Sequence, residues 1–101
     1  VMSKQQWQTV CQQINADLDW LTRRANLLIS GYEFSAADVG KIISIGAELK
    51  LQITDETDPC KKMQQAHSGL EQALTPEWRG GVTCRVIQAG LIQPDDSVNI
   101  D

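Results

Sequence analysis

The sequence has no long apolar run and none of the common short enzyme motifs. No stretch approaches the roughly 20 consecutive apolar residues that cross a bilayer. The opening VMSKQQW has one lysine followed by polar residues and no apolar core, so it does not resemble a secretory signal peptide. GxGxxG, GxxxxGK[ST] and GxSxG are absent, so the usual signals for dinucleotide binding, triphosphate binding and a hydrolase nucleophile are missing.

Positive charge is also scarce. The chain has 9 Lys and Arg against 13 Asp and Glu, which gives a net charge of −4 at pH 7. Proteins that bind nucleic acid or a membrane surface usually carry a basic excess, so we expect neither partner. An anionic ligand would need a local cluster of arginines or lysines.

Cysteine is sparse and irregularly spaced. The 3 cysteines are Cys11, Cys60 and Cys84, and no CxxC or HxxxH pair offers the ligand spacing of a zinc site. An odd number without a signal peptide is typical of reduced thiols in a cytoplasmic protein. Cys11 lies on an apolar helical stripe and Cys84 on the apolar face of a predicted strand, so we expect both to pack in the core. Cys60 lies on no such stripe or face.

Length and composition predict one globular domain. The chain has 101 residues, of which 42% are hydrophobic, and we expect a single domain over residues 1–101. A chain of this size buries only about 60–70% of the surface that it exposes when unfolded, so its core is small.

The N-terminal segment predicts a helix. Ser3 and Gln6 have the Ser-x-x-Gln spacing of a capping box, which marks a helix start. Apolar residues from Trp7 to Ile14 recur at helical spacing, so the helix should end near Ile14 or Asn15.

The middle of the chain predicts strands. ANLLIS (25–30) is a short apolar run closed by glycine and indicates a buried strand. KIISIG (41–46) and AELKLQIT (47–54) indicate two further strands, and apolar and polar residues alternate along the second. The short turn around Gly46 makes an antiparallel hairpin the simplest connection.

The second half predicts short helices and more strands. PCKKMQQA (59–66) suits a helix with Pro59 in its first turn, and Ser68 with Glu71 suits a capping box for another helix. GVTCRVIQ (81–88) predicts a strand, and a last strand follows the Pro-Asp-Asp turn. The predicted fold class is therefore mainly β (α+β), an antiparallel barrel or sandwich with short peripheral helices.

The order of these segments resembles the MOSC domain, a module found at the C-terminus of molybdenum-cofactor sulfurases and as stand-alone bacterial proteins. The resemblance is carried by RRANLLISG, by GKIISIGAELKLQIT running into PCKKM, and by WRGGVTCRVIQAGLIQPDDSV. The positions that match the family pattern in order are Arg24, Asn26, Gly40, Gly46, Cys60, Gly80, Gly81, Arg85, Gly90, Asp96 and Val98. The resemblance extends from Ser3 to Val98 and implies an antiparallel β-barrel of MOSC type.

The sequence departs from the family pattern at its start and at one turn. MOSC domains usually begin with further strands, so we expect an N-terminally incomplete MOSC domain or an unusually short protein. A barrel without those strands would have an open edge, which a homodimer or a swapped strand could pair. Asp95 stands where relatives tend to carry glycine, so that turn must tolerate a side chain.

Cys60 is the candidate catalytic residue and the candidate metal ligand. Cations and a helix N-terminus favour the thiolate, and Cys60 follows Pro59 and precedes Lys61 and Lys62. A thiolate suits molybdenum or a transferable sulfur atom better than a carboxylate does. The resemblance implies that Cys60 carries sulfur as a persulfide or ligates the molybdenum of the molybdenum cofactor. Without the resemblance, an inert thiol is the simpler interpretation.

The resemblance also implies that the chain binds molybdopterin, a pterin with a phosphate group. Arginine matches phosphate oxygens with its planar fork, so the candidates are Arg24, Arg79 and Arg85, with Arg23 beside them. Asn26 alternates with Arg24 along the predicted strand, so both should point to one face. Each arginine could instead be a solvated surface residue or pair with a carboxylate.

Two classes of function remain open from the sequence. The first is a molybdenum-cofactor module that either carries sulfur from a donor protein or reduces N-hydroxylated compounds with a redox partner. The second is a non-catalytic interaction domain that keeps the fold without the chemistry. A pyridoxal-phosphate enzyme is disfavoured, because that chemistry belongs to a separate domain of the sulfurases and no lysine here stands in a distinctive motif.

Overall fold

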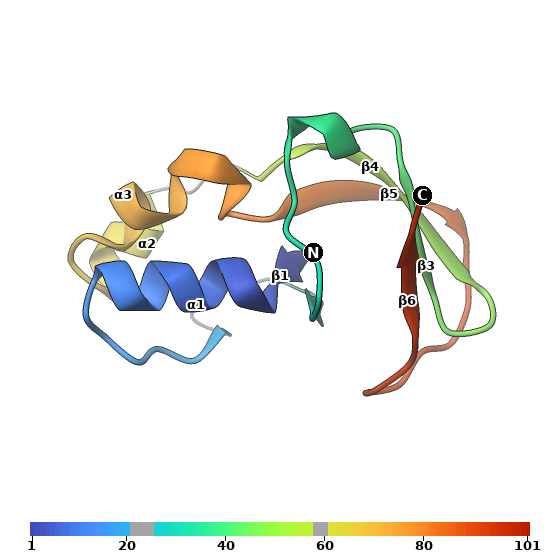
Figure 1. Cartoon of the computed structure of the whole chain (residues 1–101), viewed down its shortest axis with the longest axis horizontal. Helices are drawn as coiled ribbons and strands as arrows, with labels where there is room; N and C mark the ends of the chain where they lie inside the picture. Colours follow the sequence, from blue (N-terminus) through green and yellow to red (C-terminus); the bar gives the residue numbers. More distant parts are fainter. Residues whose placement is uncertain (21–25, 58–60) are drawn as a thin grey trace.

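The computed structural model describes residues 1–20, 26–57 and 61–101, with the side chains of Lys61 and Lys62 left out. The helices are α1 (Lys4–Gln13), α2 (Lys61–Ala66) and α3 (Leu70–Leu74), with 3-10 turns η2 (Ala36–Asp38) and η3 (Pro76–Trp78). The strands are β1 (Met2–Ser3), β2 (Leu28–Ile29), β3 (Ile42–Ile45), β4 (Leu49–Glu56), β5 (Val82–Gln88) and β6 (Val98–Ile100). The body measures 39 × 25 × 21 Å, and Figure 1 shows the three helices at one end and β3 to β6 at the other.

Helix α1 begins and ends close to the predicted residues. Ser3 is the N-cap, and its Oγ accepts a hydrogen bond from the Gln6 N–H at 3.3 Å. The other half of the predicted capping box does not form, because the Gln6 side chain turns to Phe34 instead. Gln6 Nε2 donates to the Phe34 carbonyl at 3.0 Å, and Gln6 Oε1 accepts from the Phe34 N–H at 3.0 Å. This exchange satisfies backbone groups of Phe34 that are buried away from water.

The predicted hairpin is confirmed and is the centre of a four-stranded antiparallel sheet. β3 pairs with β4, with Ile43 opposite Leu51 and Ile45 opposite Leu49. β5 adds to the free edge of β4 and β6 to that of β3, so the strand order is β5-β4-β3-β6. The alternation along β4 buries Leu51 and Ile53, as the sequence pattern predicts.

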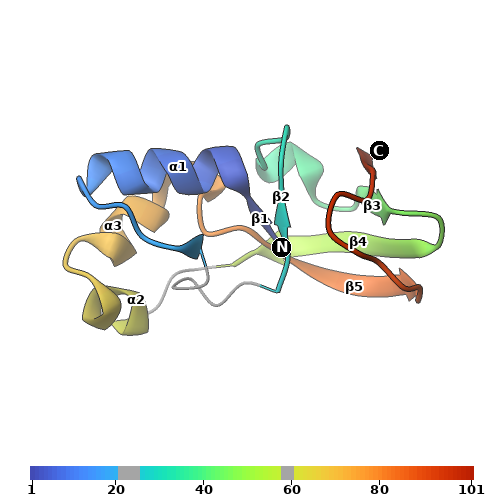
Figure 2. The same ribbon diagram turned by 90° about the horizontal axis from the view of Figure 1, so that it is seen from below.

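The strand predicted over residues 25–30 is shorter, and its pairing differs from the prediction. Within the described residues only Leu28–Ile29 forms a strand, and it pairs with β1 in parallel rather than antiparallel. Val1 then exchanges two hydrogen bonds with Val82 of β5, at 2.8 and 3.0 Å. The two-stranded sheet of β1 and β2 is therefore joined to β5 of the four-stranded sheet through Val1, and in the described part of the chain β2 and β6 do not pair. The antiparallel sheet is confirmed, whereas these strands form an open arrangement and no closed barrel (Figure 2).

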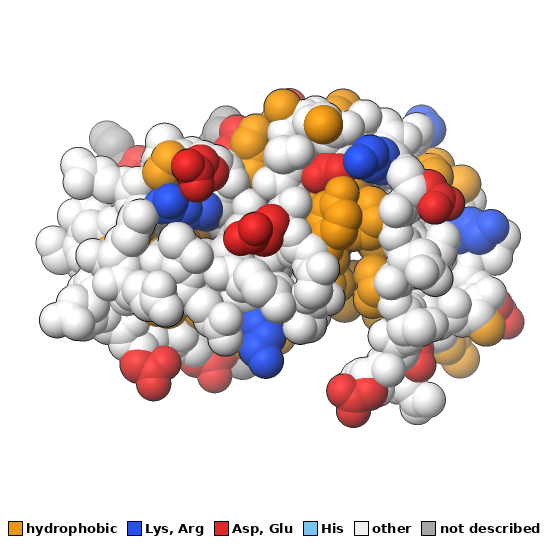
Figure 3. All heavy atoms as spheres, viewed as in Figure 1, with side chains coloured by type: hydrophobic (Ala, Val, Ile, Leu, Met, Phe, Trp, Pro, Cys, Tyr) orange, Lys and Arg blue, Asp and Glu red, His pale blue; other side chains and the backbone are white. Residues whose placement is uncertain are grey.

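Hydrophobic side chains form two separate clusters, one in each half of the body. The helical cluster joins α1 to α2 and α3 and contains Met2, Trp7, Val10, Met63, Leu70, Ala73 and Leu74. The sheet cluster contains Ile29, Phe34, Ile43, Ile45, Leu51, Ile53 and Val82. Part of the apolar interior is visible in Figure 3, in the hollow between the C-terminal strand and the middle of the molecule. Because the clusters are separate, the two halves are joined by the chain segments that pass between them and by hydrogen bonds such as those of Gln6 to Phe34.

Two turns depend on left-handed backbone. The helix predicted to begin at Ser68 instead has Gly69 as its N-cap, with φ 86° and no side-chain hydrogen bond, so the second capping box is wrong. A left-handed residue between α2 and α3 is sterically cheap only for glycine. Asp95 has φ 71°, so the turn before β6 does carry a side chain in a conformation that glycine favours.

A buried carboxylate fixes the loop that leads into β3. Asp38 is 2% exposed, and its carboxylate accepts hydrogen bonds from the Tyr32 hydroxyl and from the Ser35 N–H at 2.9 Å. Lys41 Nζ lies 2.9 Å from the same carboxylate. Burial alone would raise the pKa of Asp38, but the hydrogen bonds from Tyr32, Lys41 and Ser35 together outweigh it and lower the pKa below the ordinary 3.8. Asp38 is therefore ionised in the folded protein at neutral pH.

Replacing this carboxylate should cost stability and change its pH dependence. Asp38→Asn should lower the free energy of unfolding at pH 7 by about 2 kcal/mol, because a charged acceptor is lost from several hydrogen bonds. Since folding lowers the pKa of Asp38, its contribution is complete above pH 3.8 and disappears as the pH falls through the folded-state pKa. Urea unfolding at several pH values measures both effects. The exposed Asp17→Asn is the control, and equal losses in the two variants would contradict this role of Asp38.

Gly81 allows the N-terminal segment to contact β5. It has φ 92°, and a Cβ atom there would overlap the carbonyl oxygen of Val1. Gly40 has nearly the same backbone, with φ 91°, but nothing lies within 4 Å of an added Cβ. A comparison of substitutions at the two glycines therefore distinguishes the energetic cost of the left-handed backbone from the energetic cost of the close contact with Val1.

Alanine substitutions at these glycines should differ in cost. Gly40→Ala should destabilise the protein by about 1–2 kcal/mol through the left-handed backbone alone. Gly81→Ala should cost a further ~1–3 kcal/mol, because the neighbouring chain must move. Thermal or urea unfolding of the two variants measures the difference. Equal losses would show that the contact between Val1 and β5 does not need this glycine.

Candidate functional site

A pocket of about 460 Å³ lies where the N-terminal segment, the end of β4 and the start of β5 meet. We call it the seam pocket. Its apolar wall includes Leu27, Leu51 and Val82, and its polar edge includes Asn26, Thr57 and Cys84, with Gly80 beside them. The volume lies within the range of small-molecule sites in proteins, about 300–1,000 Å³.

Backbone hydrogen bonds hold the walls of the seam pocket in place. The Thr57 N–H donates to the Gly81 carbonyl at 2.9 Å, which ties the residue after β4 to the residue before β5. The Met2 N–H donates to the Leu27 carbonyl at 2.9 Å on the opposite side. Thr57 is three residues before Cys60 in the sequence, and residues 58–60 lie outside the described residues. The last described residue before Cys60 therefore borders the pocket.

Cys84 contributes a thiol to the seam pocket. It lies opposite Ile53 in the sheet, is half-buried and packs against the sheet cluster, which confirms its predicted packing. Burial raises the pKa of the Cys84 thiol above its ordinary value. At neutral pH it is therefore a neutral thiol, a weaker nucleophile and metal ligand than a thiolate.

The predicted cofactor-binding residues lie in different parts of the molecule. Asn26 is exposed at the edge of the seam pocket, whereas Arg23 and Arg24 lie outside the described residues. Arg85 is exposed on β5 and donates to Gln52 Oε1 at 2.8 Å. Because side chains alternate along a strand, Arg85 points away from the face that carries Cys84. The structure therefore does not bring Arg85 to Asn26.

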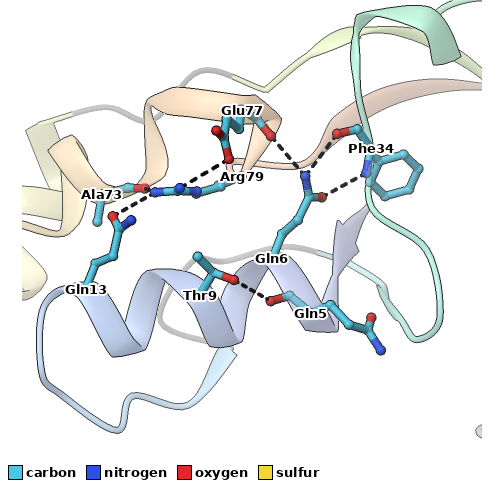
Figure 4. Close-up of polar contacts among 8 residues, drawn as sticks. All are labelled: Gln5, Gln6, Thr9, Gln13, Phe34, Ala73, Glu77 and Arg79. Atoms are coloured by element: carbon cyan, nitrogen blue, oxygen red, sulfur yellow. Dashed lines mark hydrogen bonds and ion pairs between the residues drawn. The ribbon is translucent and has the colours of Figure 1, made fainter.

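Arg79 is buried in the helical half and lines another cavity. It is 8% exposed, and its Nη1 donates to Gln13 Oε1 at 2.7 Å and to the Ala73 carbonyl at 3.3 Å. Its Nη2 lies 3.3 Å from Glu77 Oε2 (Figure 4). These contacts tie α1 and α3 to the η3 turn. The roles of Arg24, Asn26, Arg79 and Arg85 in cofactor binding, like that of Cys60, stay predictions.

Sequence reasoning missed two parts of the seam pocket. Thr57 has no local pattern that distinguishes it from the polar residues around it, and its place follows from the long-range bond to Gly81. Cys84 was expected only to pack, but the same strand face that packs against the core also borders the pocket. In the residues that the structure describes, no three His, Cys, Asp or Glu side chains gather to hold a metal ion, and no helix has the length and apolar character of a membrane span.

The fold and pocket define a small α+β protein in which an antiparallel sheet meets a helical half at a ligand-sized pocket. The chain belongs to the MOSC domain family, because the family model described as "MOSC domain" matches residues 1–99. This family is associated with molybdenum-cofactor proteins. No curated protein matches the chain.

Two solved structures are similar to the chain. YiiM from Geobacillus stearothermophilus has a TM-score of 0.81 at 20% identity, and the match covers 99% of this chain and 52% of that protein. The YuaD protein from Bacillus subtilis has a TM-score of 0.80 at 18% identity, and the match covers 98% of this chain and 60% of that protein. The chain therefore spans a little over half the length of these structures. At such identities the similarity establishes the fold alone.

The burial of Cys84 leads to a testable difference in thiol chemistry. Because burial raises its pKa, Cys84 should react with iodoacetamide at pH 8 more slowly in the folded protein than in urea-unfolded protein. Peptide mass spectrometry over time measures the rate at each cysteine separately. Equal folded and unfolded rates at Cys84 would contradict the pKa shift.

Proposed function

We propose that the chain works with the molybdenum cofactor, and that Cys60 carries sulfur or ligates the metal. Membership of the MOSC domain family over residues 1–99 is the observation that supports this most strongly. The position of Cys60 adds to it, because Thr57, three residues earlier, borders the seam pocket. When bound, the cofactor supplies a redox-active metal held by a pterin.

The seam pocket fits part of such a ligand. Its volume suits a small molecule, and its edge offers the Asn26 amide for the polar rim of a pterin, with Thr57 also in the lining. None of the described residues that line it is a lysine or arginine. The phosphate would therefore need another cation, and Arg24, two residues before Asn26, is the one we propose. Arg79 and Arg85 are less suitable for a ligand in this pocket, because both lie away from it.

The environment of Cys84 supports the assignment of the reactive thiolate to Cys60. A thiol with a raised pKa does not compete for a metal or a sulfur atom as a thiolate would. Cys60, with Lys61 and Lys62 after it in the sequence, is the cysteine whose neighbours favour the thiolate. The two free cysteines among the described residues also suit a reducing, cytoplasmic setting.

The finer activity takes one of two forms. As a sulfur carrier, Cys60 would receive sulfur from a donor protein and pass it on. As part of a reductase of N-hydroxylated compounds, the chain would need a redox partner to deliver electrons. A non-catalytic interaction domain is the alternative to both.

We also propose that the strands close into a MOSC-type barrel when a further strand pairs between β2 and β6. A cleft of about 510 Å³ separates these strands, with Leu28, Ile45 and Val98 among its apolar lining. The extra length of the similar structures provides one source for such a strand, and a second copy of the chain provides another.

Molybdenum and pterin content tests the proposed function. Protein purified from cells that make the cofactor should retain both, and Cys60→Ala should reduce metal content at least about tenfold if Cys60 is a ligand. Cys11→Ala, in the helical half, is the matched control and should retain the wild-type content. If no variant holds metal, mass spectrometry should find an added sulfur atom on Cys60. Absence of both metal and added sulfur would leave the interaction domain.

A further inference from the structure

A second cavity, of about 430 Å³, opens between α1 and the η3 turn. We call it the Arg79 pocket. Its lining includes Gln6, Thr9, Glu33, Glu77, Trp78 and Arg79. It shares no lining residue with the seam pocket. Figure 4 shows the Arg79 guanidinium on one side of this region, Gln6 on another and Thr9 on the helix beneath them.

Arg79 has hydrogen-bonding capacity left over, although it is buried. A guanidinium has five N–H donors. The Nη1 group uses both of its hydrogens on Gln13 and Ala73, and Nη2 has one contact with Glu77. For Nε–H and the remaining Nη2 hydrogen, the described residues offer no acceptor. A cation that is 8% exposed is costly to leave partly unpaired, so the site favours an added acceptor.

The carboxylate now paired with Arg79 is easily displaced. The Glu77 side chain is 79% exposed and makes its contact with Arg79 at 3.3 Å. Exposed ion pairs contribute little, because water competes for both partners. A ligand in the pocket could therefore take the place of Glu77 at low cost.

The backbone that carries Glu77 is strained. Glu77 has φ 55° and Trp78 has φ 60°, so two successive residues other than glycine are left-handed. Gln6 Nε2 donates to the Glu77 carbonyl at 3.0 Å and holds the turn in this form. Backbone strain of this kind is concentrated at ligand sites and switches. Here the strained turn brings the Glu77 side chain to Arg79. The same turn places Trp78 in the lining of the pocket.

We propose that the Arg79 pocket binds an oxyanion of the phosphate class, and that Glu77 occupies the Arg79 guanidinium when the anion is absent. The open donors of a planar guanidinium suit tetrahedral oxyanions. Glu33 in the lining repels anions and Glu77 competes for Arg79, so binding is weak in the wild type and strengthens when a neutral amide replaces the Glu77 carboxylate. The inference goes beyond the proposed function, which places the cofactor's phosphate at Arg24, and cofactor content tests whether the phosphate of the cofactor binds at Arg79 instead.

Inorganic phosphate titrated into cofactor-free protein tests the inference. Ionic strength is held constant with sodium chloride, and the indole N–H of Trp78 and the Nε–H of Arg79 are followed by NMR. We expect saturable shifts in the wild type and an affinity about fivefold higher in Glu77→Gln, which removes the competing carboxylate. Glu48→Gln removes the same charge from an exposed residue at the β3–β4 turn and should leave the affinity unchanged. Shifts that do not saturate, or equal affinities in Glu77→Gln and Glu48→Gln, would overturn the proposal.

A second pair of variants checks the cation. Arg79→Gln should abolish saturable binding, whereas Arg85→Gln, which removes an exposed arginine, should not. Retained binding in Arg79→Gln would overturn the proposal. Should Arg79→Gln fail to fold, the comparison of Glu77→Gln with Glu48→Gln still decides, because both residues are exposed.

Cofactor content distinguishes the two sources of phosphate. If the pocket holds the cofactor's phosphate, Glu77→Gln purified from cofactor-making cells should retain more pterin than the wild type, and added phosphate should release it. If the anion is free phosphate, binding persists in the titration and pterin content does not change. Failure of phosphate binding leaves the Cys60→Ala result untouched, so the two proposals fail separately.

Discussion

The pair of hydrogen bonds between Val1 and Val82 fixes the N-terminal segment against the sheet and so helps to set the position of the helical half relative to the sheet half. The helical cluster and the sheet cluster share no side chain, so their relative position depends on the segments that run between them and on hydrogen bonds such as those of Gln6 to Phe34. Val1 bonds to β5 on one side, and Met2, next in the chain, bonds to Leu27 on the other. Gly81 makes this possible, because any side chain there would collide with the Val1 carbonyl.

The same contact explains where the seam pocket lies. The seam pocket lies where the N-terminal segment, the end of β4 and the start of β5 converge, and backbone hydrogen bonds and packing in the sheet cluster both hold its walls. The Arg79 pocket lies between α1, the η3 turn and the segment around Phe34, where Gln6 joins α1 to two distant parts of the chain. In an acidic protein, the proposed sites depend on individual arginines placed against otherwise neutral or acidic surroundings.

Local patterns in the sequence were enough to predict helix α1, the β3–β4 hairpin and the strand β5. Each depends on residues that are neighbours in the chain, such as the Ser3 cap or the alternation of Leu51 and Ile53. The parallel pairing of β1 with β2 and the contacts of Gln6 could not be predicted this way, because their partners are 25 or more residues distant. The cap at Gly69 was missed because a nearby Ser-x-x-Glu pattern suggested a different start.

For the site, the sequence was informative about chemistry and less so about position. The neighbours of Cys60 and the MOSC resemblance both single it out, but they do not reveal the pocket beside Thr57. The separation of Arg85 from that pocket was open to prediction, since a strand that turns Cys84 inward must turn Arg85 outward. The burial of Arg79 was not, because it depends on Gln13 and Ala73, which no motif connects to it.

The most direct test is a comparison of backbone amide NMR shifts with and without bound molybdenum cofactor. Ligand binding in the seam pocket should move the amides of Asn26, Thr57, Gly80 and Val82 most, and leave those near the exposed side chain of Arg85 less affected. Shifts confined to the exposed face of β5, or to surfaces remote from the Val1–Val82 contact, would contradict a functional site at this junction of the two halves.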